Sequence, residues 1–99
     1  MPFEMLVGLN VADDRQYQAY RDAIGPILTG YGGGFGYDFR VSEVLRSETE
    51  APINRVFTIR FPDEASSERF FADPDYVRTK ADYFTGAVAD TTIIARYTR

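Results

Sequence analysis

The sequence predicts an α+β fold of the ferredoxin-like kind, a sandwich in which two helices cover one face of a four-stranded antiparallel sheet. The pattern of strand, helix and strand occurs twice and accounts for the whole chain of 99 residues. A β-α-β-β-α-β order is typical of this sandwich, with the strands in the order 4-1-3-2 across the sheet. Because the chain has the length of one ordinary domain and 44% hydrophobic residues, we expect residues 1–99 to form a single domain.

The first half of the chain begins with a strand over residues 3–11, in which large apolar side chains recur at every second position. Asp13 fits the N-cap of a helix whose apolar stripe runs from Tyr17 to Tyr31 at steps of three and four residues. Gly25-Pro26 predicts a kink or a restart within this helix, because proline lacks the backbone donor that a helix interior needs. The glycines at 32–34 predict the helix end, since glycine readily adopts the left-handed conformation found there.

Two further strands follow, separated by a polar turn. Residues 35–41 alternate as a strand, and the alternation breaks between Val41 and Val44, which predicts a bulge or a bend at that point. Residues 47–52 form an exposed turn, and residues 55–61 alternate again as the third strand.

The second helical region consists of two short pieces. Pro62-Asp63 ends the third strand and caps a short helix that carries Phe70 and Phe71. Asp73-Pro74 is a second cap with proline at the first helical position, and it opens a further turn or two as far as Phe84. The last strand covers residues 91–98.

The composition argues against several classes of function. The chain has neither cysteine nor histidine, which removes thiolate nucleophiles, disulfides and the usual general base near neutral pH. A net charge of −4 and a single lysine argue against nucleic-acid binding, which needs clustered cations. A metal site would have to use Asp and Glu alone, without a characteristic spacing, so we expect neither metal nor cofactor.

The start of the sequence predicts the location. The apolar stretch near the N-terminus has no basic segment before it, which argues against a signal peptide. No apolar run approaches the roughly 18–20 residues of a membrane span. We therefore expect a cytoplasmic protein without a membrane partner.

A set of tyrosines forms the first candidate binding site. These residues are Tyr17, Tyr20, Tyr31, Tyr37 and Tyr76. If they project into one pocket between helices and sheet, their hydroxyls would orient a small ligand on an otherwise apolar wall. The alternative is that the rings pack at the edge of the core, with their hydroxyls bonded to water or to backbone carbonyls.

The sheet face opposite the helices forms the second candidate site. Alternation places on it Asn10, Asp38, Arg40, Thr58, Arg60, Thr92 and Arg96. Contact with a second subunit would require ion pairs on this face, such as one between Asp38 and an arginine. Alternatively, Arg40 or Arg60 would hold an anion or a carboxylate. A bulge inside a strand would reverse these assignments, and Gly36 suits a bulge or the close approach of a ligand or a partner's backbone.

Nearly the whole chain carries short motifs that mark the ends of helices and strands. They are Tyr17 and Tyr20, Tyr31-Gly32-Gly33, Phe61-Pro62 and the segment from Phe70 to Tyr76. Together they resemble a bacterial domain-of-unknown-function family, number 1330, of the dimeric α+β barrel superfamily. Relatives in that superfamily include antibiotic-biosynthesis monooxygenases and EthD-like proteins. The resemblance implies a homodimer whose two sheets face each other as a barrel, with pockets between sheet and helices.

Three functions stay open, because a fold does not fix a function. The first is a homodimer that binds a small molecule without catalysis. The second is a cofactor-independent enzyme of monooxygenase or isomerase type, acting on a small aromatic or carbonyl substrate. In such an enzyme Tyr17, Tyr20 or Tyr37 would orient the substrate, while Asp38 or Arg60 would handle charge. The third is a structural or protein-interaction module.

Overall fold

The computed structural model describes all of residues 1–99 and confirms the predicted ferredoxin-like α+β fold. The sheet has the order β2-β3-β1-β4 with antiparallel neighbours, which is the predicted order read from the other edge. Along the chain the elements are β1 (Phe3–Val11), α1 (Asp14–Gly30), β2 (Gly34–Arg40), β3 (Arg55–Phe61), α2 (Glu64–Ala72), α3 (Pro74–Thr79), the π-helix η1 (Lys80–Phe84), α4 (Thr85–Ala87) and β4 (Val88–Thr98).

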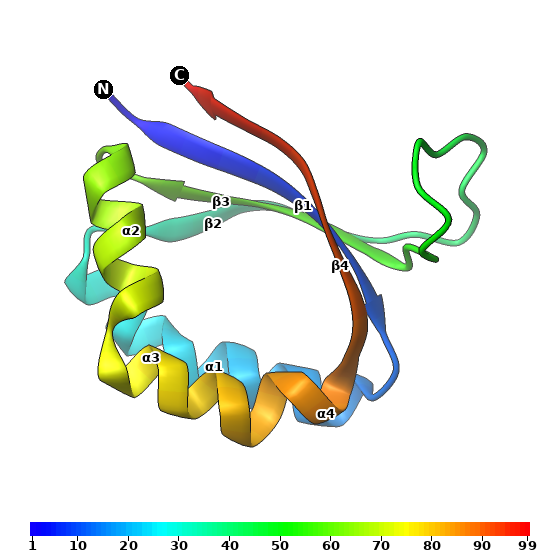
Figure 1. The fold of residues 1–99 in the computed structure, drawn as a ribbon, viewed down its shortest axis with the longest axis horizontal. Coiled ribbons are helices and arrows are strands. Elements are labelled where there is room, and N and C mark those ends of the chain that lie inside the picture. Colours follow the sequence, from blue (N-terminus) through cyan, green and yellow to red (C-terminus); the bar gives the residue numbers. More distant parts are fainter.

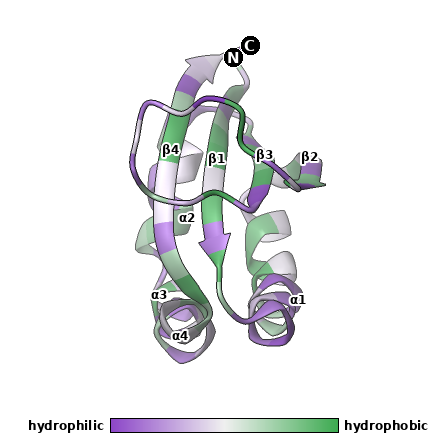
Figure 2. Ribbon diagram, turned by 90° about the vertical axis from the view of Figure 1, so that its right-hand side faces the viewer, coloured by the Kyte–Doolittle hydropathy of each residue, from purple (hydrophilic) through white to green (hydrophobic).

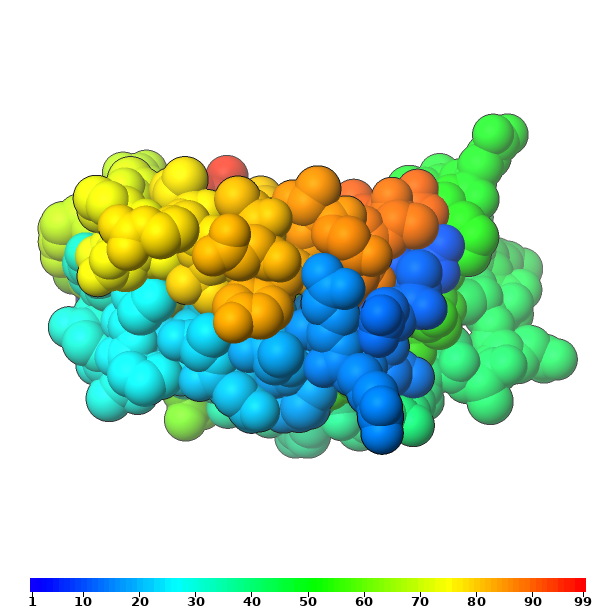
Figure 3. Space-filling view, turned by 90° about the horizontal axis from the view of Figure 1, so that it is seen from below, coloured from blue at the N-terminus to red at the C-terminus, as the bar shows by residue number.

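All helices cover one face of a strongly curved sheet, and the other face of the sheet is open (Figure 1). From below, α1 and the run from α3 to α4 lie against each other along their length and close the helical layer (Figure 3). The two termini lie together at the far end, where the Arg99 N–H donates to the Pro2 carbonyl at 2.8 Å. None of the helices has the length and apolar character that crossing a membrane requires.

The loop between β2 and β3, residues 41–54, projects on the open side of the sheet. Viewed from that end of the molecule, the loop passes in front of β4, β1 and β3 (Figure 2). Val44 and Leu45 of this loop, with Val56, Thr92 and Ile94 of the sheet, line a hollow of about 880 Å³. The loop therefore adds an overhang to the open face, whose apolar part is Val44 and Leu45 and whose polar part is residues 46–49.

The predicted helix caps are confirmed. The Asp13 carboxylate accepts a hydrogen bond from the Gln16 N–H at 3.0 Å, and Asp63 accepts one from the Ser66 N–H at 2.7 Å. Asp73 caps α3, which has Pro74 in its first turn as predicted. These carboxylates satisfy backbone donors that have no partner inside the helix and also interact favourably with the helix dipole.

The predicted restart of the first helix at Gly25-Pro26 is wrong. Helix α1 continues through Pro26 as one helix to Gly30. Its buried side, which includes Tyr17, Ile24 and Leu28, packs over the sheet on both sides of the proline. Packing of this apolar side therefore offsets the lost hydrogen bond at Pro26.

Two bulges change which side chains face the helices. In β2 the register shifts between Phe35, opposite Ile59, and Asp38, opposite Phe57, so that Gly36 and Tyr37 together oppose Thr58. This bulge lies earlier than the predicted irregularity between Val41 and Val44, which falls in the loop after the end of β2. A bulge of one extra residue turns every later side chain of the strand to the opposite face.

The face assignment from alternation is consequently wrong for four residues. Asp38 and Arg40 lie on the helix side, because they pair with Phe57 and Arg55, and Tyr37 lies on the open side next to Phe39. Arg96 also lies on the helix side, where its guanidinium contacts Glu64 of α2 at 3.4 Å, because β4 has its own register shift opposite Leu6 and Val7.

We predict that Gly32→Ala destabilises the fold, whereas Gly34→Ala does not. Gly32 has φ 74°, and a Cβ at this position would lie 2.7 Å from Cγ of Pro62. We expect a loss of about 1–2 kcal/mol in the free energy of unfolding from the left-handed backbone alone. A Cβ on Gly34 meets nothing within 4 Å, which makes this neighbour a matched control. Urea titration of both variants measures the difference, and equal midpoints would contradict the prediction.

Candidate functional site

A cavity of about 520 Å³ lies between the helical layer and the sheet. Its walls are apolar, since 15 of its 18 lining residues are hydrophobic. β1 contributes Met5 and Val7 to the walls, and α1 contributes Tyr20. Val77 comes from α3 and Phe84 from the π-helix η1. A cavity of this size and character is typical of small-molecule sites, which have apolar walls and a few placed polar groups.

Two tyrosines supply hydroxyl groups deep in the cavity. The hydroxyls of Tyr20 and Tyr76 lie 2.9 Å apart and are hydrogen-bonded to each other, and both side chains are buried. Burial raises the pKa of both phenols above the ordinary value, and it also raises the pKa of Tyr17. All three therefore remain neutral near pH 7 and act as hydrogen-bonding groups.

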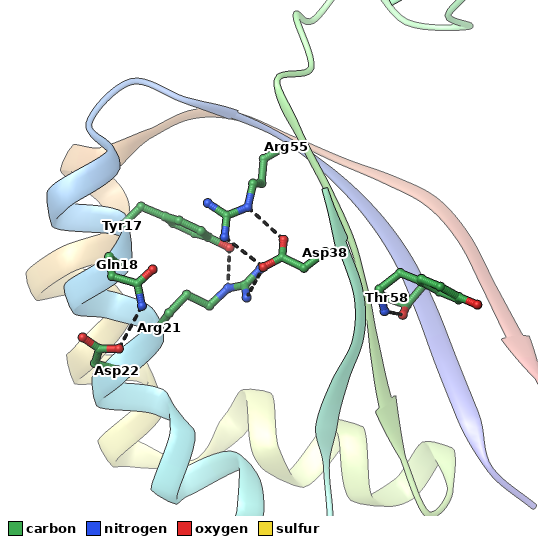
Figure 4. Close-up of polar contacts among 8 residues, drawn as sticks. Tyr17, Gln18, Arg21, Asp22, Asp38, Arg55 and Thr58 are labelled. Atoms are coloured by element: carbon green, nitrogen blue, oxygen red, sulfur yellow. Dashed lines mark hydrogen bonds and ion pairs between the residues drawn. The ribbon is translucent and has the colours of Figure 1, made fainter. Parts of the chain in front are cut away.

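Arg21 of α1 is a charged residue of the cavity wall, and its contacts with Tyr17 and Asp38 are shown in Figure 4. Its Nε donates a hydrogen bond to the Tyr17 hydroxyl at 2.7 Å, and its Nη1 contacts the Asp38 carboxylate at 3.2 Å. The guanidinium lies over the rings of Phe35 and Phe57, at 3.9 Å and 4.6 Å from the ring centroids. These contacts fix the guanidinium plane in one orientation.

Asp38 is shared between two arginines. Nε and Nη2 of Arg55 donate to its two carboxylate oxygens at 2.8 Å and 2.9 Å, and Arg21 reaches one of these oxygens. The hydrogen bonds from Arg55, with the charge of Arg21, lower the pKa of Asp38 below its ordinary value. Two guanidinium groups thus share one carboxylate, and neither of them forms an ion pair with any other acidic side chain.

The structure brings together only part of the predicted tyrosine set. Tyr17, Tyr20 and Tyr76 line the cavity as predicted. Tyr31 instead donates a hydrogen bond to Asp73 at 2.6 Å outside the cavity. Tyr37 lies on the open sheet face, where it is 70% exposed, because the β2 bulge turns it away from the helices.

The predicted charged set is also divided. Asp38 forms the predicted pair with an arginine, but this pair lies on the helix side of the sheet. Arg60 stays on the open face and is exposed, and Arg40 is exposed at the end of β2. Neither arginine lines the cavity. That Arg40 or Arg60 binds an anion therefore stays a prediction, and their positions outside the cavity do not support it.

Among the lining residues that were not singled out from the sequence, three bear most directly on the chemistry of the cavity. Arg21 lies four residues after Tyr17, so helical spacing places both on one side of α1, and this is the signal that could have found it. Lys80 and Phe84 begin and end the π-helix η1 and both line the cavity. π-Helical turns occur frequently at functional sites, but the sequence carries no clear signal for one here.

No group of three or more acidic side chains lies close enough together to hold a metal ion. On the open face, Glu4 is buried and accepts hydrogen bonds from the Tyr97 hydroxyl and from Arg99 at 3.2 Å. This carboxylate is therefore satisfied by protein groups.

Comparison with known proteins supports the fold. The family model described as a domain of unknown function (DUF1330) matches residues 5–97. A protein of unknown function from Rhodopseudomonas palustris is similar in structure, with a TM-score of 0.80 and 22% identity over 99% of this chain and 82% of that one. No curated protein matches the sequence.

Two more distant structures have the same fold. A DABB family protein with a ferredoxin-like fold from Mesorhizobium loti has a TM-score of 0.68 and 17% identity over 99% of this chain and 96% of that one. A dimeric ferredoxin-like protein of unknown function from Thermobifida fusca has a TM-score of 0.63 and 12% identity, covering 100% of this chain and 92% of that one.

We predict that Asp38→Asn destabilises the protein in a pH-dependent manner. Because the pKa of Asp38 is lowered in the folded state, its contribution to stability is complete above its unfolded value of about 3.9 and is lost as the pH falls through the folded value. The difference in free energy of unfolding between wild type and variant is expected to be about 1–3 kcal/mol at pH 7 and to shrink below about pH 4.

Urea titrations at a series of pH values between 3 and 7 measure this difference. Asp22→Asn serves as the control for the change in net charge, since Asp22 is exposed and accepts a hydrogen bond only from the neutral Gln18 amide at 2.9 Å. A difference between wild type and Asp38→Asn that stays constant down to pH 3 would contradict the prediction.

Proposed function

The chain belongs to this family of domains of unknown function, DUF1330, and we propose that it is a homodimer that binds a small, largely apolar molecule between its helices and sheet. The observation that carries the proposal is the cavity of about 520 Å³, with 15 hydrophobic residues among 18 on its walls. An apolar cavity of this size binds a ligand by removing its apolar surface from water. The paired hydroxyls of Tyr20 and Tyr76 would orient it.

The open face of the sheet supports the homodimer. Tyr37 and Phe39 stack on it at 5.7 Å between ring centroids, while they are 70% and 54% exposed. Leu45 of the overhanging 41–54 loop is 88% exposed. A contiguous apolar patch of this kind commonly marks an interface, and a second copy would cover it with the same aromatic residues. The similar protein from Thermobifida fusca is dimeric, which agrees with this assembly.

We predict that residues around the cavity, and not those on the open face, respond to a neutral aromatic probe. Titration with 2-naphthol, followed by two-dimensional NMR, is expected to shift the resonances of Tyr17, Tyr20 and Phe84, which line the cavity. Tyr37 and Phe39 serve as internal controls. Absence of shifts, or shifts confined to the open face, would overturn binding in the cavity.

The same samples test the alternative of a cofactor-independent enzyme. Chromatography after incubation with aromatic and carbonyl compounds would reveal conversion. A rate that survives metal chelation and falls in Tyr20→Phe would favour catalysis over binding alone. Binding without conversion is the result expected from the proposal.

We predict that Tyr37→Asp dissociates the homodimer. Association would bury this aromatic patch, so a carboxylate introduced into it would have to be desolvated, which disfavours association. The solution mass, measured by light scattering at micromolar concentration, is expected to fall from twice 11.2 kDa to 11.2 kDa. Tyr83→Asp is the matched control, because Tyr83 is an exposed tyrosine of the π-helix η1. A wild type that is already monomeric would refute the dimer.

A further inference from the structure

The charged side chains on the cavity wall are all cationic, although the chain has a net charge of −4. They are Arg21 at the end near β2 and Lys80 in the π-helix η1, and no carboxylate lines the cavity. Asp38 pairs with Arg21 but does not itself line the cavity, and Arg55 donates hydrogen bonds to both of its carboxylate oxygens. The cavity is therefore electropositive within an acidic protein, which favours an anionic ligand over a neutral one.

Arg21 has one donor group that no protein atom satisfies. Its side chain is only 10% exposed, and Nε and Nη1 are bonded to Tyr17 and Asp38. Nη2 is buried and has no hydrogen-bond partner. Leaving a charged donor unpaired in a buried position is costly, so the protein's own groups do not use the full hydrogen-bonding capacity of Arg21.

The aromatic side chains of the cavity wall indicate the shape of the apolar part of such a ligand. Eight of the 18 lining residues are aromatic. On the helix side, the rings of Tyr20 and Phe84 lie 4.9 Å apart, and those of Tyr17 and Tyr20 lie 5.8 Å apart in a stacked arrangement. Aromatic walls at these separations favour a flat ring system, which they can contact face to face or edge to face.

We propose that the natural ligand is a small aromatic carboxylate whose carboxylate pairs with the guanidinium of Arg21 on the cavity wall, while its rings lie among the aromatic side chains. This inference rests on the proposed function and specifies its ligand class. Arg21 is suited to the role because Tyr17, Asp38, Phe35 and Phe57 already fix its guanidinium. The binding of the carboxylate therefore requires little further ordering of the arginine.

The test compares probes that differ in a single group. Calorimetric titration of the wild type with 2-naphthoate, 2-naphthamide and 2-naphthol separates the contribution of the carboxylate from that of the rings. 2-Naphthoate is expected to bind at least about 10-fold more tightly than the neutral probes, because a charged hydrogen bond contributes about 1.5–3 kcal/mol. Octanoate, a carboxylate without rings, is expected to bind more weakly than 2-naphthoate.

Arg21→Met then removes the donors and the charge while it keeps an unbranched apolar side chain about as long as the aliphatic part of arginine. It is expected to lower the affinity for 2-naphthoate about 10- to 100-fold and so to remove most of the preference for 2-naphthoate over 2-naphthol. Arg15→Met, an exposed arginine on the same helix, is the control and should change neither affinity. If Arg21→Met does not fold, the comparison of the probes on the wild type still decides the question.

The outcomes distinguish the ligand class from the function itself. Binding of 2-naphthol without any preference for 2-naphthoate would overturn the carboxylate while leaving the apolar cavity as a binding site. A preference for octanoate would overturn the aromatic body. If none of the four probes binds and the NMR spectrum is unchanged, the proposed function fails together with this inference.

Discussion

The bulge at Gly36 and Tyr37 determines what lies on each face of the second half of β2. A Cβ on Gly36 would lie 2.5 Å from Oγ1 of Thr58, and this hydroxyl accepts the Tyr37 N–H at 2.8 Å. The bulge thus depends on glycine and on a buried threonine of the next strand. Because of it, Asp38 faces the helices and reaches Arg21 and Arg55, while the Tyr37 ring joins the open face. The exposed aromatic patch and the ion pair between Arg21 and Asp38 have one structural origin.

The cluster around Asp38 differs from an ion pair that serves stability alone. Charged side chains that are nearly buried, as Arg21 and Arg55 are here, are best tolerated when the charges balance and all donors are bonded. Arg55 by itself would satisfy Asp38, since it binds both oxygens. Arg21 adds a second cation and a buried Nη2 without a partner. Its contacts with Tyr17 and Phe35 hold it in place despite this excess charge. An anionic ligand would supply a second negative charge to this cluster, and this is the physical basis for the proposed carboxylate.

Most of the fold could be predicted from the sequence because its signals are local. The limits of β1 and β3 and the caps at Asp13, Asp63 and Asp73 follow from alternation and from short polar motifs. The bulge could not be located in this way. Phe35, Tyr37 and Phe39 are spaced as in a regular strand, and only the pairing with β3 shows that Phe35 and Tyr37 lie on opposite faces. Arg21 was missed because a polar residue beside an apolar stripe is normally exposed, and the cavity behind it exists only in the folded chain.

The protonation states of the site residues favour recognition over proton transfer. A general acid or base works best when its pKa lies near the working pH. In this cavity burial raises the pKa of Tyr17, Tyr20 and Tyr76, and Arg55 lowers the pKa of Asp38. These shifts move each pKa further from pH 7. The phenols therefore stay protonated, and the carboxylate stays charged. Neutral donors and a fixed guanidinium are suited to holding an acid in one orientation.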